Sequence, residues 1–237
     1  MVHQSVDPGG AGGVAPIASY NARPMSGASA RRWAVFLDRD GVLVDAVARD
    51  AVAGSARSLT ELRVLDGAAA AIALLHGAGA SCLVVTNQPD VRRGSLAIED
   101  LDQMHALLQA QLAFDDVAVC PHDGRDGCMC RKPLPGMLIE LAGRHHVDLG
   151  ASWLVGDRWV DIAAGRAAGV RTVLVEQAYS WEATSAGGPP TDLEPDLRAS
   201  DVMAAAQAIV AARGGRVPLP AERSNYSSGT AAKERTT

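Results

Sequence analysis

The sequence lacks several features that mark membrane, secreted or nucleic-acid-binding proteins. No apolar run approaches the roughly 20 residues that span a bilayer, and the N-terminus lacks the basic, apolar, small-residue order of a secretory signal. Basic side chains do not predominate either, since the net charge is −5, which argues against a general binder of nucleic acid or membrane surfaces. We therefore expect a cytoplasmic protein with no nucleic-acid or membrane partner. No exposed apolar seam is indicated, so we expect a monomer.

Lysine is scarce in this chain. Twenty arginines accompany only two lysines, Lys132 and Lys233, so arginine is the usual basic residue and a lysine needs a reason. The compact ammonium of lysine is favoured where a point charge must meet a phosphate. Lys132, in the run Arg131-Lys132-Pro133, is therefore a candidate phosphate-binding residue.

The length of 237 residues and the hydrophobic content of 48% fit one α/β domain with a full core. Residues 1–31 are rich in glycine, alanine, serine and proline without periodicity, and residues 214–237 have the same character. Such composition is typical of flexible tails. We expect two tails around one domain that spans residues 32–213, and we find no internal repeat.

Within this domain, apolar runs alternate with amphipathic stretches. The runs predict strands over Trp33–Asp38, Cys82–Thr86, Val117–Cys120, Trp153–Gly156 and Thr172–Val175. The stretches predict helices over Gly67–His76, Ile98–Leu112, Pro135–His145, Val160–Ala168 and Asp201–Ala212. Continuously apolar strands flanked by helices indicate a parallel sheet buried on both faces. The expected fold is a three-layer, doubly wound, Rossmann-like α/β fold, in which ligands bind beyond the carboxyl ends of the strands.

Two carboxylates follow the first predicted strand, in the run Asp38-Arg39-Asp40-Gly41. Residues two apart at a strand end can face the same cleft, and Gly41 permits the sharp turn that follows. One carboxylate can attack phosphorus, while the other protonates the leaving oxygen and then takes a proton from water. Mg²⁺, which prefers carboxylate oxygens, would balance the two negative charges. The alternative is an ordinary solvated loop.

Polar side chains also follow two further predicted strands. Thr86, Asn87 and Gln88 offer a hydroxyl and two amides that suit a phosphoryl oxygen, unless they form an ordinary polar turn. Asp157 follows another strand, and Asp161 lies four residues on, one helical turn away on the same face. We expect a supporting role for Asp161, with a helix-start residue favoured by the helix dipole as the alternative.

Two tight pairs of metal-binding residues precede Arg131: Cys120-Pro121-His122 and Cys128-Met129-Cys130. Three thiolates and one imidazole form a closed tetrahedral Zn²⁺ site with no open position, so we expect a structural role. Zinc should then order the loop at residues 120–130. Free cysteines in a loop are the alternative. Cys82 lies in an apolar run and is expected to be a small buried hydrophobic residue.

The run FLDRDGVL and the polar residues that follow it in order resemble the motifs of haloacid dehalogenase superfamily phosphatases. The resemblance covers roughly residues 33–180. It implies that Asp38 is the nucleophile and Asp40 the acid/base, with Thr86 and Lys132 completing the catalytic group. It also implies an Mg²⁺ site formed by Asp38, the backbone carbonyl of Asp40, and Asp157.

The zinc loop directly before Arg-Lys-Pro resembles one branch of this superfamily, which contains bacterial heptose 1,7-bisphosphate phosphatases and histidinol phosphatases. The segment between Gly41 and Thr86 is too short for a separate cap domain beside its expected helix and strand. We therefore expect a capless site with the zinc loop as one wall. The resemblance also implies substrate contacts. Expected substrate-binding residues are Asn87, Gln88, Arg93, Arg131 and Arg158.

The substrate is expected to be a small phosphorylated metabolite, and the arginine before Gly94 favours a sugar bisphosphate. Arg92 or Arg93 would be available for its second phosphate, with solvent-facing basic residues as the alternative. The residues at 44–50 lack the aromatic that the heptose enzymes usually carry there. The leading hypothesis is a D-glycero-D-manno-heptose 1,7-bisphosphate 7-phosphatase. Histidinol-phosphate phosphatase, a phosphotransferase, and a catalytically silent zinc-containing binding relative are the alternatives.

Overall fold

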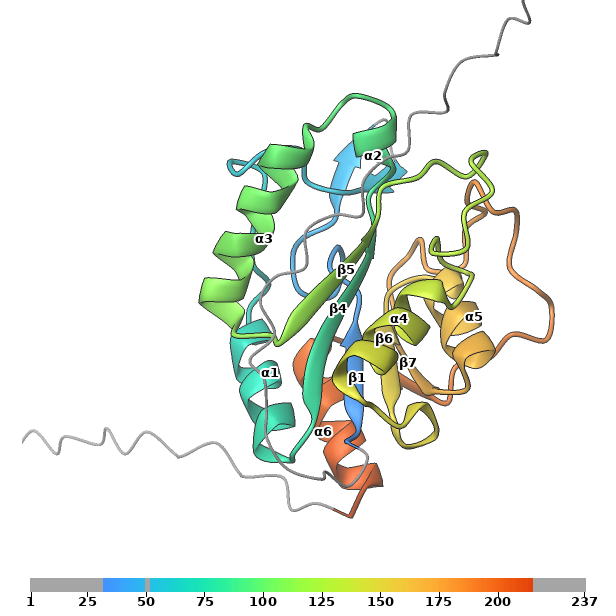
Figure 1. Cartoon of the computed structure of the whole chain (residues 1–237). Helices are drawn as coiled ribbons and strands as arrows, with labels where there is room; N and C mark the ends of the chain where they lie inside the picture. The colour runs from blue at the N-terminus through green and yellow to red at the C-terminus, as the bar shows by residue number, and fades with distance from the viewer. Residues whose placement is uncertain (1–31, 50–51, 215–237) are drawn as a thin grey trace, which may run out of the picture.

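The computed structural model describes residues 32–49 and 52–214 (Figure 1). Apart from Gly214, both predicted tails lie outside the described residues, so their flexibility stays a prediction. None of the helices in the described ranges is long and apolar enough to cross a bilayer.

A parallel six-stranded sheet forms the centre of the domain, with strand order β5-β4-β1-β6-β7-β8. Its strands are β1 Ala34–Leu37, β4 Ser81–Asn87, β5 Asp116–Cys120, β6 Trp153–Gly156, β7 Arg171–Val175 and β8 Leu197–Ala199. All five strands expected from the sequence are present. The sequence did not predict β8, which is short and only partly buried.

Helices cover both faces of the sheet, as a doubly wound fold requires (Figure 1). On one face lie α1 Ala68–Gly77, α3 Ile98–Leu112 and α6 Val202–Ala212, and on the other lie α4 Gly136–His145 and α5 Trp159–Ala168. The bounds of α3 agree with the sequence prediction, and those of the other four differ by one residue at one or both ends. The expected three-layer α/β fold is therefore confirmed.

The central strand β1 shows why its run is continuously apolar. Val35 and Leu37 pack into the cluster beneath α1 and α6, while Ala34 and Phe36 pack into the cluster beneath α4. All four side chains are completely buried. Successive residues of a strand point to opposite faces, so a strand covered on both sides can place no polar side chain until it ends.

The segment between β1 and β4 contains a small antiparallel hairpin, formed by β2 Val47–Arg49 and β3 Val52–Gly54. Two further short elements lie elsewhere, the one-turn helix α2 Pro89–Arg92 and a 3₁₀ turn at Leu149–Ala151. The described residues between β1 and β4 form no separate cap domain, in agreement with the expected capless arrangement.

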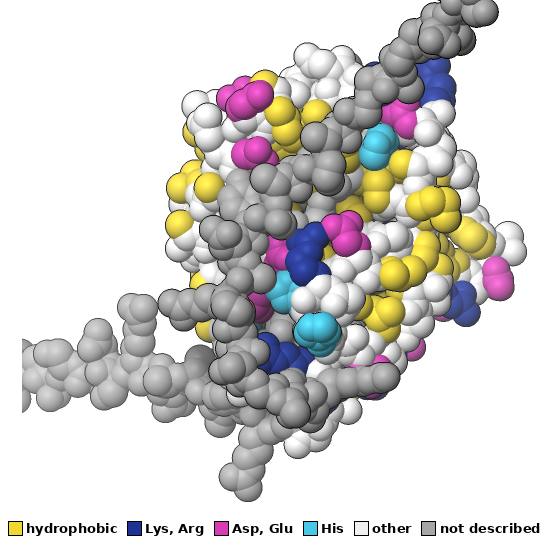
Figure 2. Space-filling view, viewed as in Figure 1, with side chains coloured by type: hydrophobic (Ala, Val, Ile, Leu, Met, Phe, Trp, Pro, Cys, Tyr) yellow, Lys and Arg dark blue, Asp and Glu magenta, His cyan; other side chains and the backbone are white. Residues whose placement is uncertain are grey.

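Hydrophobic side chains gather on the surface over α4 and the loop that precedes it (Figure 2). Met129, Leu134 and Ile139 are the large exposed hydrophobic residues of this region. The oligomeric state expected from the sequence stays a prediction, because exposed apolar residues are common on monomers.

Candidate active site

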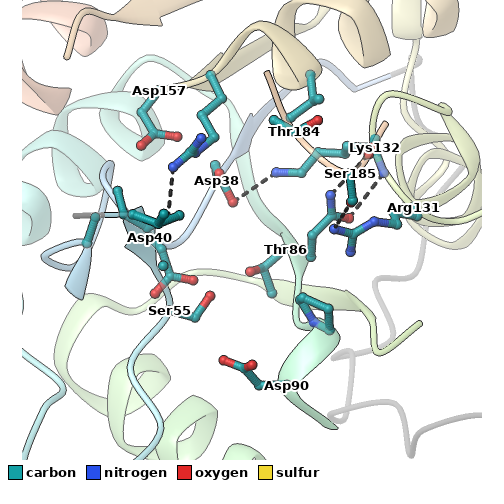
Figure 3. Close-up of a pocket in the computed structure, with 18 of the residues that line it drawn as sticks. Asp38, Asp40, Ser55, Thr86, Asp90, Arg131, Lys132, Asp157, Thr184 and Ser185 are labelled. Carbon is teal, nitrogen blue, oxygen red and sulfur yellow. Dashed lines mark hydrogen bonds and ion pairs between the residues drawn. The ribbon is translucent and has the colours of Figure 1, made fainter. Parts of the chain in front are cut away.

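The carboxyl ends of β1, β4 and β6 border one cavity of about 550 Å³ (Figure 3). Its walls are completed by the β2–β3 hairpin, the loop before α4, and residues 183–186. The predicted site residues that line this cavity are Asp38, Asp40, Thr86, Asn87, Arg93, Arg131, Lys132, Asp157 and Arg158. The structure therefore brings together side chains that lie up to 120 residues apart in the sequence.

Lys132 lies between two carboxylates. Its Nζ is 2.9 Å from Oδ1 of Asp38 and 2.6 Å from Oδ1 of Asp161, and it also donates to the carbonyl of Val85 at 3.0 Å. The Lys132 side chain is only 1% exposed. Burial alone would lower the pKa of Lys132, but the charges of Asp161 and Asp38 outweigh this effect and raise it above its usual range. The ammonium is therefore a permanent positive charge beside Asp38.

The acidic side of the site carries more negative charge than Lys132 balances. Burial raises the pKa of Asp38 to about 7, against the opposing effect of Lys132. Burial, together with the charges of Asp38 and Asp161, also raises the pKa of Asp157 well above its ordinary value. Oδ1 of Asp157 is buried and has no hydrogen-bond partner among the described residues. Crowded carboxylates with an unpaired oxygen are the donor set that suits a hard divalent cation such as Mg²⁺.

Two glycines permit this close packing. Gly41 has a φ of 82°, and a Cβ there would lie 2.0 Å from Oδ2 of Asp157. At Gly156 a Cβ would lie 2.1 Å from the Cβ of Asp161. Any side chain at either position would displace a carboxylate of the site, so both positions depend on glycine.

Asp161 contributes to the site through the start of α5. Its Oδ2 accepts a hydrogen bond from the backbone N–H of Arg158 at 3.0 Å, while its Oδ1 contacts Lys132. Its ligand oxygens also lie within 4.8 Å of those of Asp38 and Asp157. The helix-start role considered from the sequence is therefore present, while the supporting role of Asp161 at the metal site stays a prediction.

The polar residues at the carboxyl end of β4 differ in their surroundings. Thr86 lines the cavity, and its Oγ1 accepts a hydrogen bond from Nε2 of Gln88 at 2.8 Å, which leaves the hydroxyl proton of Thr86 to be donated. Gln88 is completely buried and also donates to Asp40 at 2.9 Å. Asn87 exchanges two hydrogen bonds of 3.1 Å with the backbone of Lys132. Both amides thus hold other site residues in place, and their expected contact with substrate stays a prediction.

Three predicted arginines reach the cavity while anchored at its rim. Arg93 binds Asp123 at 2.6 Å. Arg131 donates to the carbonyl of His122 at 3.1 Å, and Arg158 donates to the carbonyl of Ala53 at 2.9 Å. Each anchor uses only part of a guanidinium, which has five N–H donors, so donors remain for an anion.

Arg92, the alternative to Arg93 in the sequence, does not line the cavity. Its side chain is 63% exposed and pairs with Asp126. Sequence reasoning did not identify the pocket residues Arg57 and Asp90, which form two hydrogen bonds of 2.9 Å. No motif marks this pair, since Arg57 and Asp90 are 33 residues apart.

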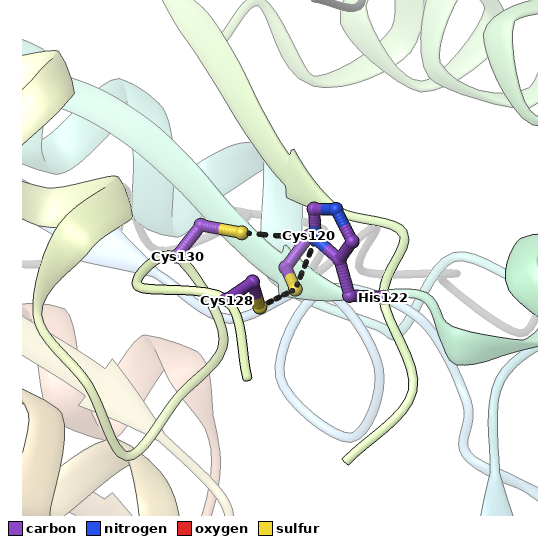
Figure 4. A group of neighbouring side chains, drawn as sticks. All are labelled: Cys120, His122, Cys128 and Cys130. Atoms are coloured by element: carbon purple, nitrogen blue, oxygen red, sulfur yellow. Dashed lines mark hydrogen bonds between the residues drawn. The ribbon is translucent and has the colours of Figure 1, made fainter. Parts of the chain in front are cut away.

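The three cysteines and the histidine of the loop at residues 120–130 come together (Figure 4). Sγ of Cys120 lies 3.6 Å from Sγ of Cys128 and 3.6 Å from Nδ1 of His122, which lies 3.2 Å from Sγ of Cys130. Tetrahedral Zn²⁺ with bonds of about 2.3 Å separates its sulfur ligands by about 3.7 Å. The four residues therefore form a cluster that could hold a metal ion. Cys82 lies apart from it and is buried in the main core, as expected.

Comparison with known proteins places this geometry in a family. A family model described as "HAD-hyrolase-like" matches residues 129–206. The D-glycero-β-D-manno-heptose-1,7-bisphosphate 7-phosphatase of Pseudomonas putida is 36% identical over 165 residues, which cover 67% of this chain and 91% of that protein. The chain belongs to the haloacid dehalogenase superfamily. The resemblance seen in the sequence is thereby confirmed.

Two further superfamily members are similar to the chain. The crystal structure of D,D-heptose 1,7-bisphosphate phosphatase from Bordetella bronchiseptica, complexed with magnesium and phosphate, has a TM-score of 0.64 and 34% identity, and the match covers 76% of this chain and 99% of that one. The D-glycero-α-D-manno-heptose-1,7-bisphosphate 7-phosphatase of Mycobacterium tuberculosis is 40% identical over 48% of this chain and 60% of that protein. All three relatives are phosphatases.

Proposed function

We propose that this chain is an Mg²⁺-dependent phosphomonoester hydrolase that removes the 7-phosphate of D-glycero-D-manno-heptose 1,7-bisphosphate through an aspartyl-phosphate on Asp38. The observation that carries the chemistry is the buried ammonium of Lys132, 2.9 Å from Asp38 at the base of the cavity. The observation that carries the substrate is the similarity to the heptose bisphosphate phosphatases over most of their length.

Asp38 is suited to be the nucleophile because its two oxygens have different surroundings. Oδ1 accepts from the backbone N–H of Arg39 at 2.7 Å and lies beside Lys132. None of the described residues donates a hydrogen bond to Oδ2, so this oxygen would attack phosphorus. The hydroxyl of Thr86 and the ammonium of Lys132 would contact the phosphoryl oxygens as charge shifts onto them.

Asp40 would act as the general acid and then as the general base. It would give a proton to the oxygen of the departing sugar, and later accept a proton from the water that hydrolyses the aspartyl-phosphate. Asp38, Asp157 and the backbone carbonyl of Asp40 would hold Mg²⁺, which when bound neutralises negative charge on the phosphate. Asp161 would keep Lys132 directed at Asp38.

The cavity is suited to a substrate with a second phosphate. It is lined by Lys132 and five arginines against four aspartates, although the whole chain has a net charge of −5. Arg93 and Arg131 would bind the second phosphate, since both face the cavity from beside the zinc loop. We further propose that Cys120, His122, Cys128 and Cys130 hold Zn²⁺ in a structural role, which fixes Arg131 through the carbonyl of His122.

Phosphate release from a substrate panel tests the proposal. The panel contains both anomers of the heptose 1,7-bisphosphate, histidinol phosphate and simple sugar monophosphates, each with Mg²⁺ and with EDTA. We expect Mg²⁺-dependent release with a preference for one heptose bisphosphate. Preference for histidinol phosphate would overturn the proposed substrate. Absence of phosphate release from every compound would overturn the proposal that the chain is a phosphatase. Recovery of a phosphorylated acceptor in place of free phosphate would instead indicate a phosphotransferase.

A further inference from the structure

A completely buried arginine lies beside the catalytic residues without a part in the proposed chemistry. Arg39 stands between Asp38 and Asp40, and its side chain is 0% exposed. Its Nε donates to Oδ2 of Asp40 and its NH2 to Oδ1, each at 3.1 Å. A guanidinium that donates hydrogen bonds to both oxygens of a carboxylate fixes the plane and direction of that carboxylate.

The third nitrogen of Arg39 is held from α3. NH1 lies 3.2 Å from Nε2 of His105, a residue that is only 2% exposed. A guanidinium can only donate, so Nε2 must accept and His105 must be neutral with its proton on Nδ1. Burial, together with the positive charge of Arg39, lowers the pKa of His105 to about 3. The imidazole is therefore a fixed acceptor at any pH at which the enzyme would work.

We propose that His105 and Arg39 are positioning residues that together orient the carboxylate of Asp40 toward the leaving oxygen of the substrate. The inference rests on the proposed role of Asp40 as acid/base. His105 sets the rotamer of Arg39 from α3, and Arg39 transmits this constraint to both oxygens of Asp40. Gln88 adds a contact of 2.9 Å to one of them.

A purely structural role for His105 makes a different prediction. If the imidazole only satisfies a buried donor, its loss destabilises the fold and lowers the rate for every substrate alike. If His105 positions the general acid Asp40, its loss lowers the rate most for substrates whose leaving oxygen needs a proton. A sugar alkoxide needs that proton, whereas p-nitrophenolate leaves without one, so the leaving group separates the two roles.

The experiment measures kcat/KM of the full-length, Mg²⁺-loaded protein for phosphomonoesters whose leaving groups range from p-nitrophenol to alkyl and sugar alcohols. This parameter includes the steps up to departure of the leaving group, where Asp40 acts as acid. His105→Phe keeps the ring volume and removes the acceptor, while His105→Gln keeps an acceptor oxygen. Met104→Ala is the matched control, because Met104 is the buried neighbour of His105 on α3 and packs in a separate apolar cluster.

We expect His105→Phe to lower kcat/KM about tenfold more for alkyl phosphates than for p-nitrophenyl phosphate, within the roughly 10²–10⁴-fold that general acid catalysis supplies. His105→Gln should restore most of the kcat/KM that His105→Phe loses for alkyl phosphates. Met104→Ala should lower kcat/KM by the same factor for all substrates. The inference would be overturned if both His105 variants lowered kcat/KM by the same factor for every leaving group, or if neither variant lowered it. Asp40→Asn identifies failure of the proposed function, because an unchanged dependence on the leaving group in that variant would remove the role on which the inference rests.

Discussion

Replacing Asp38 by asparagine should abolish turnover and at the same time stabilise the metal-free fold. Burial raises the pKa of Asp38 from 3.8 to about 7. Between these values the folded protein binds the proton more tightly than the unfolded chain does, so stability falls as pH rises from about 4 to about 7. A shift of roughly 3 units corresponds to about 4 kcal/mol of destabilisation above pH 7.

The gain from Asp38→Asn should be smaller than this figure. Asparagine keeps an oxygen that can accept from the N–H of Arg39, but it loses the attraction between the carboxylate and Lys132. We expect a gain of about 1–3 kcal/mol at pH 8, and for a domain of this size each kcal/mol raises Tm by about 2–4 °C. At pH 5 the gain should be smaller, because the wild-type carboxyl is then largely protonated.

Urea and thermal unfolding between pH 5 and pH 8 test this expectation. The protein is kept without added Mg²⁺, and its metal content is measured. Stability of the wild type should decrease across this range more steeply than that of the variant. The exposed Asp66 supplies a control, Asp66→Asn, which removes the same charge outside the site. A less stable Asp38→Asn protein at pH 8, with an unchanged pH slope, would refute the reasoning.

Three other changes test separate parts of the site. Lys132→Met should lower kcat at least 10²-fold, since it removes the charge beside the transferred phosphoryl group, and single-turnover phosphate release would measure this; a rate within tenfold of wild type would contradict it. Arg131→Gln should raise KM about tenfold for the heptose bisphosphate but leave KM for monophosphates unchanged, and equal effects in steady-state assays would exclude a second-phosphate role. Gly156→Ala should destabilise the fold by about 1–3 kcal/mol, because its Cβ would meet Asp161; an unchanged urea midpoint would show that α5 can shift.

The predictable part of the fold is the part where burial controls the residue pattern. β1, β4, β6 and β7 are nearly completely buried, so each appears in the sequence as a short continuous apolar run. β8 and the β2–β3 hairpin have three-residue strands that are half exposed. Their residues carry no such pattern. Sheet edges and hairpins are stabilised by backbone hydrogen bonds between strands, and these bonds tolerate many different side chains.

The candidate site divides in the same way. Asp38 and Asp157 directly follow buried strands, and Thr86 lies near the end of one. Parallel strands have their carboxyl ends at one edge of the sheet, so the proximity of these residues could be expected. Lys132 was marked by the rarity of lysine. His105 could not be identified, because a histidine on an amphipathic helix is an ordinary residue until its partner is known. That partner, Arg39, lies 66 residues away, and the distance between them depends on how α3 packs on the sheet.

The burial of Lys132 also gives the protein an internal chemical reporter. Lys132 is the only lysine within residues 32–214, since the other is Lys233. Its ammonium is enclosed by Asp38, Asp161 and the carbonyl of Val85. An amine-acylating reagent can therefore modify this domain on a lysine only when the catalytic centre opens. The acylation rate of the peptide that contains Lys132 would therefore report how often the active site opens transiently. A phosphate analogue bound in the site should slow this acylation.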